Sequence, residues 1–225
     1  MTGSVLDRFS RPDGADGPGA TGVEVLLARH PEVDANVTGR FVGTGESPYT
    51  AEGLRQRQLL AGCIAAWGPS CVHTSPRERA RAVARDVAEA ARVALHVDDG
   101  LAEIDFGAAE GLTYEEATRR GVQIDLLGGP DDSAPFSGGE SWDAFSQRVA
   151  AAAGRAEGCG ARVAVIAHGG VIRALLTHWL GMPHQSAWRF AVANAAISTL
   201  TLWEGRGTLR TFGVPAGCCE WESRE

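Results

Sequence analysis

Two segments of the chain end an apolar run on a histidine. In VLLARHP the run stops at Arg29 and His30, and in AVIAHGG it stops at His168, which Gly169 follows. Binding sites in open α/β sheets form beyond the carboxyl ends of the strands, so the two histidines could meet in one pocket. The glycines would let the backbone approach a ligand, and a helix that begins there favours an anion. For either histidine alone, the alternative is a polar strand end without a role.

Two other segments contribute arginines and carboxylates. TSPRERA places Arg77 and Arg79 beside a turn, and LAEIDFGAAEG places Glu103 and Glu110 in a loop broken by glycines. A guanidinium group can bond two phosphate oxygens at once, and a carboxyl group can transfer a proton. Each segment alone also fits a solvated surface. Together with the histidines, they favour a site for a phosphate group.

The pattern of apolar residues predicts strands that alternate with long helices. Strands are expected over 23–28, 70–75 and 162–167, with a terminal hairpin formed by 196–203 and 208–212. Long helices are expected over 51–67, 77–95, 142–157 and 168–181, and a short helix should begin at the capping box of Thr113 and Glu116. This order implies an α/β fold of three layers, α/β/α, around a mostly parallel central sheet.

Composition sets limits on the organisation and the partners. A chain of 225 residues with a net charge of -7 fits one globular domain and argues against a nucleic-acid partner. No run approaches the roughly 18–20 apolar residues of a membrane span, and the N-terminus lacks the pattern of a secretory signal. We expect a flexible leader over 1–21, a single domain over 22–214 with an irregular capping loop at 121–141, and a tail over 215–225.

The cysteines and basic residues narrow the chemistry further. Five cysteines without a CxxC spacing resemble neither a zinc site nor a disulfide framework, which favours a reducing, cytoplasmic location. All 21 basic residues are arginine, so a Walker lysine and a lysine Schiff base are excluded. There is also no GxSxG elbow.

Several motifs, in order, resemble the histidine phosphatase superfamily, the phosphoglycerate mutase-like branch with an Arg-His-Gly motif. The similarity covers about residues 23–213 and is carried by ARHPEVDANVTGRFVG, PYTAEGLRQRQ, TSPRERARAVA, LAEIDFGAAEG, SGGES, VIAHGGVIRALL and ANAAISTLTL. Motifs in a fixed order are far more specific than any one of them. The resemblance implies a phosphoglycerate mutase-like fold and a phosphomonoesterase of the phosphatase type.

The resemblance also implies roles for individual residues. His30 would be the nucleophile that becomes a phosphohistidine, and Glu103 the general acid and base, with Glu110 in reserve. His168 would complete the catalytic set, and the phosphate would be bound by Arg29, Asn36, Arg79 and Gly169. Neither a metal nor a cofactor is expected.

Four positions depart from the family's pattern. Pro31 replaces the usual Gly and so removes a backbone N–H beside the nucleophile, and Val33 replaces a common Thr. Arg77 and Val83 replace the usual Leu and Thr of their motif. None of the four removes a catalytic side chain, so we expect activity with an unusual choice of substrate.

Other functions stay open as alternatives. A phosphoglycerate-type phosphomutase is the nearest, although HGGVIR resembles the phosphatase branch; a non-catalytic binding protein that retains the fold and a metallohydrolase are further ones. The expected partner is a small phosphorylated metabolite, recognised by residues 41–49 and 121–141, and a homodimer is a further open alternative.

Overall fold

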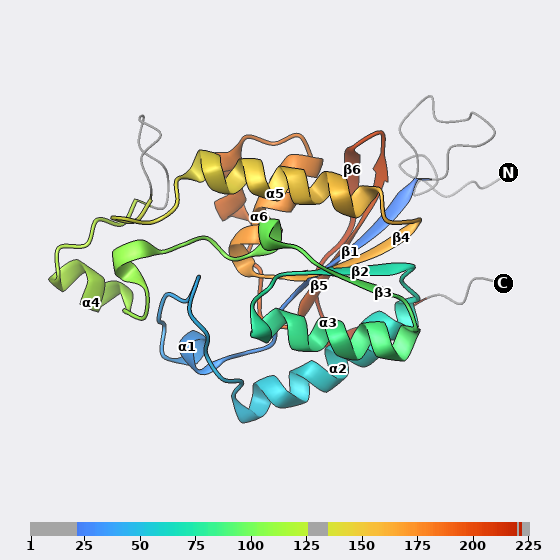
Figure 1. Ribbon diagram of the computed structural model, residues 1–225, viewed down its shortest axis with the longest axis horizontal. Helices are drawn as coiled ribbons and strands as arrows, with labels where there is room; N and C mark the ends of the chain where they lie inside the picture. The colour runs from blue at the N-terminus through green and yellow to red at the C-terminus, as the bar shows by residue number, and fades with distance from the viewer. Residues whose placement is uncertain (1–21, 126–134, 220, 222–225) are drawn as a thin grey trace, which may run out of the picture.

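The computed structural model describes residues 22–125, 135–219 and 221, so the expected leader and the middle of the expected capping loop lie outside the described residues. Its centre is a six-stranded sheet in the order β3-β2-β4-β1-β5-β6 (Figure 1). The strands are β1 (Val23–Arg29), β2 (Cys71–Thr74), β3 (Ala94–Val97), β4 (Arg162–Ala167), β5 (Ala196–Trp203) and β6 (Arg206–Pro215). β1 to β4 are mutually parallel, and β5 and β6 form the antiparallel hairpin.

Four long helices cover the sheet, two on each face. α2 (Ala51–Trp67) and α3 (Glu78–Ala91) lie on one side, and α5 (Trp142–Glu157) and α6 (Gly169–Trp179) lie on the other (Figure 1). The short helices α1 (Asp34–Val37) and α4 (Tyr114–Arg119) lie at the left of Figure 1, and the 3-10 turns are η2 (Asp99–Leu101), η3 (Gly107–Ala109), η4 (His184–Arg189) and η5 (Ala216–Cys218). The expected three-layer α/β/α fold with a mostly parallel sheet is confirmed.

The apolar run in β1 is continuous because both faces of this strand are covered. Val25 and Leu27 point to the α5 and α6 side, whereas Leu26 and Ala28 point to the α2 and α3 side. All four are fully buried. A buried central strand of a parallel sheet has this composition, with no polar alternation.

The helix expected over 77–95 is shorter than the sequence indicates. α3 ends at Ala91, and Arg92 takes the left-handed conformation with φ 57°. Ala94 to Val97 then pair with β2 as the edge strand β3. The expectation of helix through Leu95 was wrong because strand pairing outweighs the helix propensity of an alanine-rich segment. The Thr113–Glu116 capping box is confirmed at the start of α4.

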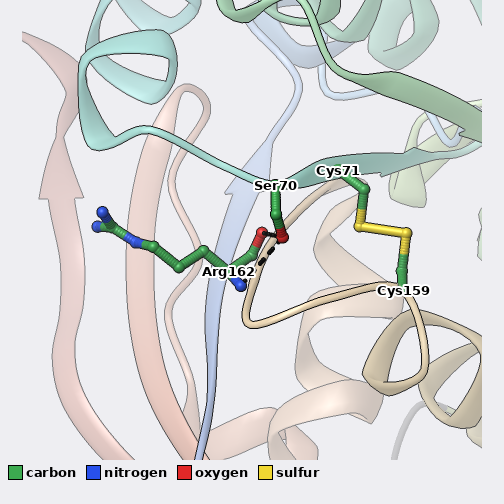
Figure 2. Close-up of a disulfide and its surroundings, with 4 residues drawn as sticks. All are labelled: Ser70, Cys71, Cys159 and Arg162. Atoms are coloured by element: carbon green, nitrogen blue, oxygen red, sulfur yellow. Dashed lines mark hydrogen bonds between the residues drawn. A yellow bond between two sulfur atoms is a disulfide. The ribbon is translucent and has the colours of Figure 1, made fainter.

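The interpretation of the cysteines needs one correction. Cys71 and Cys159 form a disulfide that joins the start of β2 to the segment after α5 (Figure 2). The two cysteines are 88 positions apart, so no local spacing in the sequence points to the pair. Cys63, Cys218 and Cys219 are free thiols.

The described parts of the expected capping loop and of the expected C-terminal tail pack on the domain. In the 121–141 segment, Ile124 pairs with Phe136, whose side chain is buried. Near the C-terminus, the indole of Trp221 lies tilted against Trp67, at a centroid distance of 6.4 Å, and donates a hydrogen bond to the carbonyl of Cys63 at 2.9 Å. None of the described helices has the length and apolar character that a membrane span requires.

Candidate active site

The two strand-end histidines meet because β1 and β4 are adjacent and parallel. Arg29 is in register with Ala167, so the residues that follow, His30 and His168, leave the sheet side by side. Their ring centroids lie 5.1 Å apart, and both side chains are buried. The two histidines therefore lie side by side, as the sequence predicts, although only His30 reaches the wall of the neighbouring cavity.

The hydrogen bonds of His30 determine which ring nitrogen is free. Nδ1 lies 2.7 Å from the carbonyl oxygen of Pro31. A carbonyl only accepts, so Nδ1 carries the proton and donates it, which leaves a lone pair on Nε2. The carbonyl of Pro31 thus fixes the tautomer of His30, although Pro31 lacks the backbone N–H of the usual glycine.

Asn194 holds the loop that carries the nucleophile candidate. Its amide donates to the carbonyls of His30 and Pro31 and, at 3.0 Å, to Oδ1 of Asn36. Oδ1 of Asn36 also accepts the backbone N–H of Val33, so its Nδ2 is left as the donor at the cavity wall. Asn194 has no role in the expected site, although ANAAIS belongs to one of the motifs that carry the resemblance.

His30 borders a cavity of about 220 Å³ whose wall is cationic and aromatic, and His168 lies behind His30, outside the lining of this cavity. Four arginines line it, together with one carboxylate: Arg29, Arg40, Arg79, Arg173 and Glu103. The aromatic part of the wall consists of Phe41, Phe106, Phe136, Trp142 and Trp188. Arg77 is not part of this wall. This agrees with the resemblance, which implies that Arg79 and not Arg77 binds the phosphate.

Arg79 lines the cavity and also donates hydrogen bonds to the loop at its rim. Its guanidinium donates to the carbonyls of Val42, Gly43 and Gly45, at 2.8–3.1 Å, and is 3% exposed. Arg29 donates to the carbonyl of Val192, and its buried Nε has no partner among the described residues. Arg29 therefore keeps a free donor for an anion.

The first turn of α6 completes the site. The N–H of Gly170 donates to Oε2 of Glu103 at 3.1 Å, and a Cβ at position 170 would lie 2.4 Å from Oε1 of the same carboxyl. Glycine is therefore needed for Glu103 to reach this position. Gly169, at the start of α6, also lines the cavity, as does Arg173 one turn later.

The sequence did not identify Arg173 as a site residue, because all 21 basic residues are arginine and a single one carries little information. Its guanidinium lies 5.3 Å from the ring centroid of Trp188, and its Nε donates to the carbonyl of Phe190. The useful signal was its spacing of one helical turn from Gly169.

The reserve candidate Glu110 is occupied elsewhere. Its carboxylate accepts backbone N–H bonds from Gly43, Thr44 and Phe106 at 2.9–3.3 Å. Glu110 does not line the cavity, whereas Glu103 does. The geometry therefore favours Glu103 as the proton donor.

The site's cations are held in unfavourable surroundings. Burial lowers the pKa of Arg29, with Arg173 and Arg79 adding to the effect and Glu103 opposing it. Burial, followed by Arg29 and Arg79, holds the pKa of His30 well below 6.5. The same causes, with His30 itself, hold the pKa of His168 well below that value. An anion would relieve this repulsion, so the cavity suits a phosphate dianion.

Fold and site together define an α/β protein with an arginine-lined cavity beside two buried histidines of lowered pKa. The sequence profile described as the histidine phosphatase superfamily (branch 1) matches residues 25–215, and the chain belongs to this superfamily. The resemblance that the ordered motifs indicated is thereby confirmed.

Individual relatives are similar over most of their length. The chain is 30% identical to the adenosylcobalamin/alpha-ribazole phosphatase of Salmonella typhimurium, over 86% of this chain and 98% of that protein. It is 33% identical to a probable phosphoglycerate mutase, GpmB, of Proteus mirabilis, over 78% of this chain and 83% of that protein. The crystal structure of the alpha-ribazole phosphatase from Shigella flexneri superposes with a TM-score of 0.76 at 28% identity, over 85% of this chain and 96% of that one.

The buried histidines predict a stability that falls in mild acid. An unfolded histidine takes up a proton as the pH drops through about 6.5, whereas folded His30 and His168 stay neutral, so acid favours the unfolded chain. The urea midpoint should therefore fall between about pH 7.5 and about pH 5.5, and His168→Gln should remove part of that slope. The exposed His178, changed to Gln, is the control. Equal slopes in the two variants would contradict the prediction.

Proposed function

We propose that the protein is a phosphomonoesterase that hydrolyses a small phosphate ester through a phosphohistidine on His30. The observation that carries the proposal is the free Nε2 of a buried, neutral His30 beside an arginine-lined cavity. Membership of the superfamily supports a phosphatase or a mutase, and relatives named as alpha-ribazole phosphatases favour the former.

The first chemical step transfers the phosphoryl group to the enzyme. The lone pair of His30 Nε2 forms a bond to phosphorus while the bond from phosphorus to the ester oxygen breaks. Glu103 gives its proton to that leaving oxygen, so the alcohol departs neutral. Arg29, Arg79 and an N–H of His168 would stabilise the charge on the other phosphoryl oxygens.

The second step returns the enzyme to its starting state. The Glu103 carboxylate takes a proton from water as the water oxygen bonds to phosphorus. The bond between Nε2 and phosphorus breaks, the electron pair returns to His30, and inorganic phosphate leaves. Because arginines supply the positive charge, we propose that the reaction needs no metal ion.

The wall of the cavity bears on the substrate class. Trp142 and Trp188 meet edge to face at a centroid distance of 5.7 Å, and Arg173 lies over Trp188. Such a surface accepts an apolar or ring-bearing leaving group better than a small polar one. Ribazole phosphate therefore stands first in a substrate panel, with sugar phosphates and phosphoglycerates after it. The cytoplasmic location that the sequence predicts is kept as part of the proposal.

The nucleophile is tested by His30→Ala. Removing it should lower phosphate release by about 10³-fold or more, as loss of a nucleophile does in other enzymes. Rapid acid-free quench of the wild type with a ³²P-labelled ester should trap an acid-labile phosphoenzyme, which the variant lacks. His96→Ala, an exposed change on β3, is the matched control. A fully active His30→Ala enzyme would refute the mechanism.

The general acid is tested by the same change at two carboxylates. Glu103→Gln should lower kcat by about 10²–10⁴-fold, because proton transfer is lost. Glu110→Gln should leave kcat within about tenfold and instead cost about 1–3 kcal/mol of stability, because a charged acceptor of three N–H groups is replaced. Steady-state kinetics and urea unfolding measure the two effects. A reversed pattern in folded variants would reassign the acid.

The mutase alternative is separated by product analysis. With phosphoglycerate as substrate, a mutase isomerises it and depends on a bisphosphate primer, whereas a phosphatase releases inorganic phosphate without one. We expect phosphate release that the primer does not raise, and no isomerised product. Primer-dependent isomerisation faster than release would favour the mutase instead.

A further inference from the structure

A cluster of soft ligand atoms lies away from the phosphate cavity. The Sγ atoms of Cys71 and Cys159 and a ring nitrogen of His73 all lie within 4.8 Å of one another. Cys71 and His73 are two positions apart on β2, so they share the face of the sheet that α5 covers. Cys159 follows Gly158, the residue that ends α5.

The backbone holds the two cysteines together whether or not they are bonded. β2 and β4 are paired, with Cys71 in register with Val163. Just before this pair, the Ser70 hydroxyl donates to the carbonyl of Arg162 at 2.7 Å and accepts the N–H of the same residue at 3.2 Å (Figure 2). The Cα atoms of Cys71 and Cys159 lie 6.4 Å apart. Reduction of the disulfide would therefore leave two thiols facing each other.

The imidazole of His73 supports a metal ligand independently of the two cysteines. Its side chain is buried, at 4% exposed, and neither ring nitrogen has a hydrogen-bond partner in the described part of the chain. A buried polar group without a partner costs free energy, and natural proteins keep few of them. The ring stacks on His96 at a centroid distance of 4.8 Å, a contact that satisfies neither nitrogen. A metal ion would give one nitrogen the partner it lacks.

An open cavity adjoins the cluster. Its volume is about 570 Å³, and its wall includes His73, His96, Asp98, Arg155 and Cys159. An ion bound by the three side chains could therefore take a fourth ligand from this cavity. Two thiolates, one imidazole and one exchangeable position form a ligand set that Zn²⁺ accepts in proteins.

We propose that the reduced protein binds one Zn²⁺ through the Cys71 and Cys159 thiolates and the His73 imidazole, with the fourth position open to solvent. The disulfide and the zinc site use the same sulfurs, so they exclude each other. A dithiol reductant gives two electrons and two protons to the disulfide and is itself oxidised to a disulfide. Zn²⁺ then displaces one proton from each thiol.

The zinc site is separate from the phosphate site. Cys71 begins β2, and Val163, its partner in register, is near the start of β4, whereas Ser75 and His168 follow the ends of these strands. The two sites therefore lie at opposite ends of the sheet. Zinc binding can be measured without any assay of turnover, so its failure would leave the proposed phosphatase function untouched.

The test uses the full chain, reduced with a dithiol and then freed of it without oxygen. Co²⁺ should give the visible bands of tetrahedral cobalt and a near-ultraviolet thiolate charge-transfer band. Zn²⁺ should abolish both bands at one equivalent. Cys159→Ser should remove the charge-transfer band. His73→Gln should weaken binding by about 100-fold or more, since even outer-shell changes at metal sites cost about 10–100-fold.

Cys63→Ser is the matched control, because Cys63 is a half-buried cysteine on α2 outside the cluster, and it should bind as the wild type does. Circular dichroism and phosphate release should be unchanged in Cys159→Ser, whose side chain is only half-buried, so a loss of binding there is not a loss of fold. The proposal is overturned if the reduced wild type binds no metal, if the disulfide form binds equally well, or if the folded His73→Gln protein binds as tightly as the wild type.

Discussion

The parallel hydrogen bonding of β1 with β4 is the constraint on which the rest of the site depends. Because Arg29 is in register with Ala167, the residues that follow the two strands lie next to each other. Both of these residues, His30 and His168, are histidines. Because the strands are central and covered on both faces, both rings are buried where they leave the sheet, with His30 4% and His168 0% exposed. Burial then lowers the proton affinity of both rings, and the nearby arginines lower it further. Two adjacent histidines of lowered pKa are thus a consequence of where the sheet ends.

The charge balance of the cavity follows from the same burial. Arg29, Arg79 and Arg173 are kept near one another, and Glu103 is the carboxylate that acts on all three, while Glu46 also pairs with Arg79 at 3.6 Å. Backbone carbonyls accept hydrogen bonds from each of the three guanidinium groups. These bonds offset part of the repulsion between the arginines but leave their positive charges in place. An anion in the cavity would therefore offset the excess of positive charge that the arginines create.

Sequence reasoning succeeded where the signal is local. The buried strands, the cap at Thr113 and the ordered motifs all predict what the structure contains, including the convergence of His30 and His168. It failed where the deciding contacts are distant in the chain. β3 forms because β2 lies beside it, and the Cys71–Cys159 pair forms because β2 and β4 are neighbours. Neither event leaves a pattern within a short window of residues.

Residue type also limited what the sequence could show. In a chain whose basic residues are all arginine, Arg173 cannot be told from a surface arginine until α6 places it at the cavity. Glu103 and Glu110 belong to one motif and have the same chemistry, and only the structure shows that Glu103 lines the cavity whereas Glu110 binds the N–H groups of a loop. Asn194 likewise acquires its role from the carbonyls that it contacts.

Two side chains fix the backbone of the rim loop, residues 42–45. Arg79 donates hydrogen bonds to its carbonyls, and Glu110 accepts hydrogen bonds from its N–H groups. Both partners bind the main chain, so most side chains of the loop are free to vary without loss of its shape. Gly43 is the exception, because a Cβ there would lie 2.0 Å from the carbonyl oxygen of Ile104. The chemistry of the cavity wall at this loop can therefore change by exchange of side chains alone, while the backbone path stays the same.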